Sequence, residues 1–220
     1  MKKLFVLPFA PSSNADQAGH RLAFDIIKND SLSSDISLLL LLNHDCDVSN
    51  ELYSLCEGRI SKIIVGRLAT FLSWVLGGGW VYPRFCTRFS KGALNDFFRY
   101  LALNKFDCIR FEFSQTFLFG YFLKKRKDIS SSRILFSAHD LQLQVVFRRE
   151  GWEHFFCGWA GRSEKEILKS ADEIVLLSKK DEVIVQSVLD VSVPVVVQNP
   201  ILSSFVYKLA AIESDKREPN

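Results

Sequence analysis

The chain has 220 residues, of which 48% are hydrophobic, so it can bury the core of one domain, and a disordered chain is excluded. Its formal net charge of +3 is too small to indicate nucleic acid as a partner. The five cysteines are an odd number without a CxxC pair, which argues against a disulfide framework or a zinc site and favours a reducing cytoplasm.

Short apolar runs alternate with amphipathic segments along the whole chain. In chain order, the pattern predicts strand 3–7, helix 19–28, strand 36–42, helix 50–56, strand 60–65, helices 68–76 and 92–103, strand 106–111, helix 116–127, strand 133–137, one or two helices within 141–169, strand 173–177, helix 179–189 and strand 193–198. Such alternation predicts an α/β fold, a single Rossmann-like, doubly wound, mostly parallel sheet with helices on both faces.

Two segments resemble membrane-related signals. The opening MKKLFVLPFA has two lysines and an apolar run, but the run is short, contains Pro8 and lacks a clear cleavage site, so we interpret it as the first buried strand. The run 63–76 is only about 14 residues long and carries Arg67, whereas a bilayer span needs about 20 apolar residues. A transmembrane helix is therefore not expected, and contact with a membrane surface remains open.

Ligands of doubly wound sheets bind beyond the carboxyl ends of the strands, so the residues after each strand are the candidates. Gly19 and His20 open the first helix, where a glycine allows close backbone approach and free N–H groups favour phosphate. The alternative is that Gly19 only shapes the turn. The loop is neither GxGxxG nor a P-loop, which argues against dehydrogenases and ATPases.

Three further polar residues follow predicted strands. His139 comes after strand 133–137 and is suited to proton transfer or phosphate binding; otherwise it packs or caps the next helix. Asp140 is its neighbour in sequence. Glu112 follows strand 106–111 and either binds a sugar hydroxyl or forms a structural ion pair. The four histidines show no ligand spacing, so no metal site is expected.

The middle of the chain is basic. From Arg59 to Lys105 there are eight basic residues and one acid, Asp96, and aromatic residues lie between the charges. This pattern suits an amphipathic surface at a bilayer interface, and the alternative is a helical cover whose aromatic residues face the core. The residues predicted for this membrane or acceptor patch are Trp74, Trp80, Arg84 and Arg88.

Taken in order, these features resemble the amino-terminal, acceptor-side domain of GT-B-fold glycosyltransferases of the family 4 type. The resemblance spans Val6 to Leu202. It rests on the loop with the helix-opening glycine (11–21), FDCIRFE (106–112), LFSAHD (135–140), SEKEILKSADEIVLLSKKDEVIV (163–185) and VPVVVQNPI (193–201).

The resemblance implies transfer of a sugar from a nucleotide-sugar donor, which is a substrate, to a glycan or lipid-linked acceptor, with no cofactor. By matching position, His139 is the implied catalytic residue in the cleft. Gly19 is the implied residue near the donor phosphates and the acceptor, and we predict His20, Glu112 and Asp140 as further donor-phosphate or acceptor contacts. Family members often have paired glycines where this chain has Gly19 followed by His20.

The resemblance also predicts the domain organisation. Residues 1–202 correspond to the amino-terminal domain and 203–220 to a charged tail, and no donor domain is expected after Asn199. A donor-domain glycosyltransferase subunit is therefore the expected partner, unless the chain is a truncated form. The alternative is a non-catalytic module that holds a glycan, lipid or protein at the membrane surface. Under both hypotheses, this chain is expected in the cytoplasm or at the inner face of the membrane.

Overall fold

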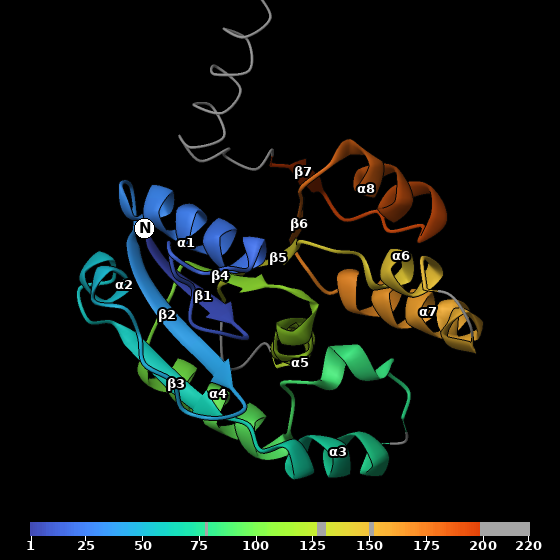
Figure 1. Ribbon diagram of the computed structural model, residues 1–220, viewed down its shortest axis with the longest axis horizontal. Coiled ribbons are helices and arrows are strands. Elements are labelled where there is room, and N and C mark those ends of the chain that lie inside the picture. Colours follow the sequence, from blue (N-terminus) through green and yellow to red (C-terminus); the bar gives the residue numbers. More distant parts are fainter. Residues whose placement is uncertain (78, 127–130, 150–151, 199–220) are drawn as a thin grey trace, which may run out of the picture.

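Seven parallel strands form one sheet in the order β3-β2-β1-β4-β5-β6-β7 in the computed structural model, which describes residues 1–77, 79–126, 131–149 and 152–198 (Figure 1). The strands are β1 (Lys2–Leu7), β2 (Asp35–Leu42), β3 (Ile60–Ile64), β4 (Cys108–Glu112), β5 (Arg133–Ala138), β6 (Glu173–Leu176) and β7 (Val195–Val197).

Helices connect the strands. The α-helices are α1 (Ala18–Ser31), α2 (Asn50–Leu55), α3 (Arg67–Leu76), α4 (Lys91–Leu103), α5 (Phe117–Lys125), α6 (Gln142–Phe147), α7 (Cys157–Leu168) and α8 (Lys179–Val183). Short helical turns are η1 (Pro83–Cys86), η2 (Ser114–Thr116), η3 (Trp152–Phe156) and the π-helical turn η4 (Ile184–Val188). The predicted Rossmann-like, doubly wound α/β fold is confirmed. The predicted boundary at 202 and the tail 203–220 lie outside the described residues.

Two apolar cores cover the two faces of the sheet. Along β1, Phe5 and Leu7 pack into the core that α1 and α2 cover, whereas Leu4 and Val6 pack into the core on the opposite face. Successive side chains of a strand point to opposite faces, so an apolar run is the sequence expected for a strand covered on both sides. The second core is the larger one and is covered by α4, α5, α7 and η4.

The chain changes direction between β1 and β4, which are neighbours in the sheet. After β1 the chain enters α1 on one face, and after β4 it enters α5 on the other face. The two connections diverge at this topological switch point and leave a crevice beyond the carboxyl ends of the strands. The loop after β1, the residue after β4 and the residue after β5 therefore meet at one edge of the sheet.

Candidate functional site

Glu112 and His139 meet at the carboxyl edge of the sheet. Glu112 is the last residue of β4 rather than the residue after it, and it pairs in register with Ser137 of β5, two residues before His139. The His139 Nε2 lies 2.6 Å from Glu112 Oε2, and both side chains are buried. The structure thus brings together two of the residues selected from the sequence.

Arg110 completes a buried polar array with them. It lies two residues before Glu112, on the same face of β4, and its Nε donates to Glu112 Oε1 at 2.5 Å. Its Nη2 also donates to Ser137 Oγ at 3.1 Å and to Gln198 Oε1 at 3.2 Å. Every described hydrogen bond of the guanidinium is thus to an oxygen, as a buried cation requires, and its Cζ also lies 5.6 Å from the centroid of the Phe5 ring.

The array fixes the charge on Glu112. Burial acts to raise the pKa of this carboxyl, but the Arg110 charge and the hydrogen bonds from His139 and Ser137 outweigh it and lower the pKa from 4.5 to about 2. An ionised carboxylate only accepts, so His139 donates through Nε2. In the neutral tautomer the lone pair is then on Nδ1, which is buried and has no hydrogen-bond partner among the described residues.

Four rings lie in series across the edge of the sheet. His139 stacks on Phe113 at 3.8 Å between ring centroids, Phe113 meets Phe9 edge-on at 4.8 Å, and Phe9 stacks on His20 at 3.7 Å. The series joins the ends of β5, β4 and β1 to the first turn of α1. His20 is half-buried, and burial lowers its pKa although a backbone contact with Ala10 opposes the shift.

Phe113 occupies the space beside Gly19. A Cβ added at Gly19 would lie 3.3 Å from Phe113 Cε1, so the glycine lets this ring pack against the start of α1. Phe113 itself has φ of 66° and ψ of 145°, a backbone conformation that costs a non-glycine residue roughly 1–3 kcal/mol. Asp140 is exposed and forms no hydrogen bond or ion pair with any other described residue.

The four residues predicted for the membrane or acceptor patch differ in exposure and in the residues that they contact. Trp80 is exposed and its ring lies 5.4 Å from that of Tyr121, whereas Trp74 is half-buried and donates from Nε1 to the Val81 carbonyl at 2.9 Å. Arg84 is half-buried in η1. Arg88 donates from Nε to the Pro8 carbonyl at 3.1 Å and so faces the end of β1.

Sequence analysis did not select Arg110, Phe113 or Glu164. A signal for Arg110 was present, because a cation within a buried strand needs an anion on the same face, and Glu112 is two residues on. Glu164 of α7 is buried and caps α6, accepting from the backbone N–H of Gln142 at 2.7 Å and of Leu143 at 2.9 Å. Burial, the largest effect, raises the pKa of Glu164 to about 7.

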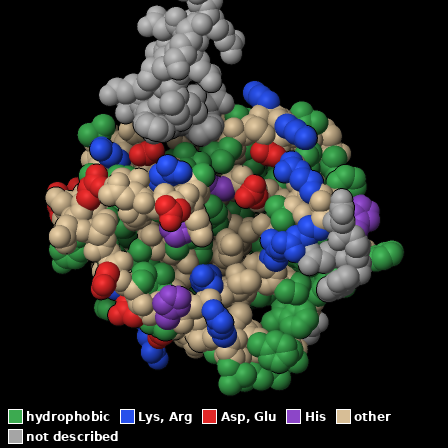
Figure 2. Space-filling model, viewed as in Figure 1, with side chains coloured by type: hydrophobic (Ala, Val, Ile, Leu, Met, Phe, Trp, Pro, Cys, Tyr) green, Lys and Arg blue, Asp and Glu red, His purple; other side chains and the backbone are tan. Residues whose placement is uncertain are grey.

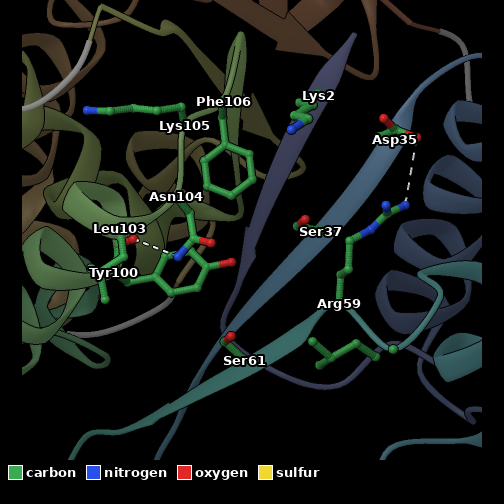
Figure 3. Close-up of a pocket in the computed structure, with 12 residues that line it drawn as sticks. Lys2, Asp35, Ser37, Arg59, Ser61, Tyr100, Leu103, Asn104, Lys105 and Phe106 are labelled. Carbon is green, nitrogen blue, oxygen red and sulfur yellow. Dashed lines mark hydrogen bonds and ion pairs between the residues drawn. The ribbon is translucent and has the colours of Figure 1, made fainter.

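A cavity of about 470 Å³ lies at the opposite, amino edge of the sheet (Figure 3). Its wall includes Lys2 and Asp35, the first residues of β1 and β2, with Tyr100 from the end of α4. Arg59 reaches across one side of the opening to Asp35 at 3.9 Å. The strands separate this cavity from His139, so it is not part of the candidate site. The described residues contain no cluster of three side chains suited to a metal ion.

Comparison with known proteins supports the fold. No family model matches the chain, and neither does any curated protein. UGT2 of Phytolacca americana, solved with UDP-2-fluoro-glucose and pterostilbene, matches 93% of the chain with a TM-score of 0.51 and 12% identity. A sucrose-phosphate synthase structure from Thermosynechococcus elongatus matches 98% of the chain with a TM-score of 0.51 and 11% identity, and the match covers 99% of that structure.

The chain spans only about half of the Phytolacca structure, 54% of its length. Identities this low show the fold alone. The described residues therefore form a Rossmann-like domain that matches one domain of the GT-B glycosyltransferase fold.

Proposed function

We propose that this chain forms the acceptor-binding wall of a glycosyltransferase, of the family 4 type, that transfers a sugar from a nucleotide-sugar donor to a glycan or lipid-linked acceptor. The observation that carries the proposal is the array of Arg110, Glu112 and His139 beside the switch point of a GT-B-like domain. A second domain, on this or another chain, supplies the contacts to the nucleotide.

The array can prepare His139 as a base. As the acceptor oxygen bonds to the anomeric carbon, the bond from that carbon to the diphosphate oxygen breaks and the nucleoside diphosphate leaves. The acceptor hydroxyl loses its proton in this step, and a group within hydrogen-bond reach must take that proton. Because Glu112 accepts from Nε2, the Nδ1 of His139 is the nitrogen with the lone pair. The ionised Glu112 also stabilises the imidazolium that forms, and Arg110 keeps Glu112 ionised.

Access to Nδ1 requires a local movement, since this atom is buried. Phe113 is the residue best placed to move, because its ring covers one face of the imidazole and its backbone already has an unfavourable conformation. We propose that closure of the donor domain, with acceptor bound, moves Phe113 away from His139.

The test is sugar transfer by the chain combined with the donor-domain protein that co-purifies with it from the native host. We expect His139→Ala to lower the rate of transfer by roughly 10²–10⁴-fold, the range of a lost general acid or base. His154→Ala, at an exposed histidine on η3, is the matched control and should transfer at the wild-type rate. Equal rates for wild type and His139→Ala would refute the assignment of His139.

A second candidate is a non-catalytic module that binds a glycan, lipid or protein. The burial of His139, which is 9% exposed, favours it, because an enclosed imidazole can equally serve as a structural partner of Glu112. In that case the chain with its partner shows no transfer, yet still retains the glycan or lipid in a binding assay, and His139→Ala changes stability alone.

A further inference from the structure

Helix α3 exposes an apolar surface. None of its residues is buried, and Leu68, Phe71 and Leu76 are 71%, 58% and 84% exposed. Leu72 and Val75 are also exposed on this helix. Figure 2 shows these hydrophobic side chains gathered over α3, which lies at the periphery of the molecule in Figure 1. A contiguous apolar patch of this kind marks an interaction site on a globular protein.

The inner side of α3 is attached to the rest of the domain. Trp74 donates from Nε1 to the Val81 carbonyl at 2.9 Å, and its ring lies 6.2 Å from that of Trp159 on α7. Ser73 accepts from the backbone N–H of Lys91, the first residue of α4, at 3.2 Å. These contacts fix the rotation of the helix, so the outward direction of the apolar residues is a property of the fold.

Cations lie beside the apolar surface, and the segment of sequence that carries it has no acid. The sequence from Ile60 to Asn95, which contains α3, has no Asp or Glu, and it includes Arg67 at the start of the helix and Lys91 beside it. On the face drawn in Figure 2, Lys and Arg side chains lie next to the hydrophobic ones over α3, with no acidic side chain among them. A further cation, Lys125, lies over the ring of Tyr121, which is 5.4 Å from the ring of Trp80.

We propose that this α3 surface, defined as Leu68, Phe71, Leu72, Val75 and Leu76 with the cations Arg67 and Lys91, docks the protein on an anionic bilayer. Apolar side chains with flanking cations and no acid match the acyl chains and anionic headgroups of one leaflet. A protein partner could cover the apolar residues with a groove of its own, and it would not need the cations that flank them on this chain. No described helix is long and apolar enough to cross a membrane, so this contact is with the surface.

The proposal goes beyond the proposed function and does not depend on it. α3 follows β3 at the carboxyl edge of the sheet, the edge that also carries Glu112 and His139. Docking would therefore place the candidate site near the headgroups, where a lipid-linked acceptor would be presented.

Vesicle flotation of the full chain tests the proposal. The probes are vesicles of phosphatidylserine with phosphatidylcholine and vesicles of phosphatidylcholine alone. The first variant, Phe71→Ser with Leu76→Ser, removes exposed apolar groups, and its matched control is Leu103→Ser, a residue 85% exposed at the amino edge. The second variant, Arg67→Glu with Lys91→Glu, is compared with the exposed Lys105→Glu. Near-ultraviolet circular dichroism confirms that each variant is folded.

We expect the wild type to float with phosphatidylserine vesicles and to bind phosphatidylcholine vesicles much more weakly. Each cation lost should lower the partition coefficient about fivefold, and the serine variant should lose most binding. Both controls should float like the wild type. Flotation of the serine variant at the wild-type level would overturn the proposal. The proposal would also be overturned if the wild type bound neither kind of vesicle but formed a dimer, and if Phe71→Ser with Leu76→Ser made that dimer dissociate. The α3 surface would then bind a second copy of the chain.

Discussion

The imidazole of His139 and the carboxylate of Glu112 are 2.6 Å apart, although 27 positions separate them in the sequence. The pairing of β4 with β5 brings them together, because Glu112 ends one strand and His139 follows the other. Arg110 neutralises the carboxylate from the same face of β4. The energetic consequence is that removal of the Glu112 carboxylate would leave the buried Arg110 without an anion.

Glu112→Gln should therefore destabilise the fold strongly. The substitution keeps the shape of the side chain but leaves the buried Arg110 without its anion, and breaking a buried ion pair from one side costs roughly 3–5 kcal/mol. Urea unfolding at neutral pH measures this loss in the free energy of unfolding.

The matched control for that experiment is Asp96→Asn. Asp96 pairs with Arg99 on the surface of α4, with side chains 56% and 81% exposed, and such pairs contribute about 0–1 kcal/mol. A loss in Glu112→Gln no larger than that in Asp96→Asn would mean that the Arg110 charge is satisfied without Glu112.

Glu164 should make stability depend on pH in the neutral range. Its folded pKa is about 7, raised from 4.5 by burial and by the Asp181 charge, so the folded state binds a proton that the unfolded state releases. The free energy of unfolding should thus fall as pH rises from about 4.5 to about 7, by at most about 1.4 kcal/mol per pH unit. Urea unfolding at several pH values, with Glu164→Gln for comparison, measures this slope.

The two buried carboxyls act in opposite directions. The pKa of Glu112 is lowered, so its contribution to stability is complete above 4.5 and is lost as pH falls toward about 2. Its window therefore does not overlap that of Glu164. A Glu164→Gln variant with the same slope between pH 4.5 and 7 as the wild type would assign the slope to another group.

The sheet could be predicted from the sequence because most strands are short apolar runs, such as β2, and these alternate with segments of helical spacing. The edge positions of His139 and Glu112 followed from the same pattern, since residues after parallel strands share one edge. The contacts could not be predicted in the same way. Phe113 has a positive φ, which cannot be predicted for a phenylalanine from its residue type. Its ring fills the space beside Gly19 that was expected to be open to a phosphate.

Gly120→Ala should be destabilising, since α5 packs closely on the sheet at this glycine. A Cβ there would lie 2.3 Å from Phe136 Cε1 and 3.0 Å from Phe111 Cε2, and both rings are fully buried. Overpacking of a core costs about 1–3 kcal/mol or more. Thermal unfolding measures the change in Tm.

Gly158→Ala is the control, because this glycine is also helical, in α7, but an added Cβ would meet no atom within 4 Å. Alanine in an open helical position should be neutral or stabilise by about 0.5–1 kcal/mol. If both alanine variants had the wild-type Tm, the close approach of α5 to Phe136 would be wrong.

Residues 1–220 in isolation should bind nucleotide sugars weakly. The start of α1 offers backbone N–H groups, but the Phe113 ring lies against Gly19, so a diphosphate can reach only part of this turn. On the proposed function, the base and ribose contacts come from the second domain. We expect a dissociation constant above about 1 mM, equivalent to less than about 4 kcal/mol of binding free energy. Calorimetry with uridine and guanosine diphosphate sugars measures it.

The variant that sharpens this experiment is Gly19→Ala. Its Cβ would point at Phe113 Cε1 and Cζ, 3.3 and 3.4 Å away, rather than into the crevice, so weak binding at the helix start should change little. Micromolar binding by the wild type that Gly19→Ala abolishes would instead place the diphosphate against Gly19. The Phe113 ring would then have to leave that position when the donor binds, and this chain, not a second domain, would carry the donor site.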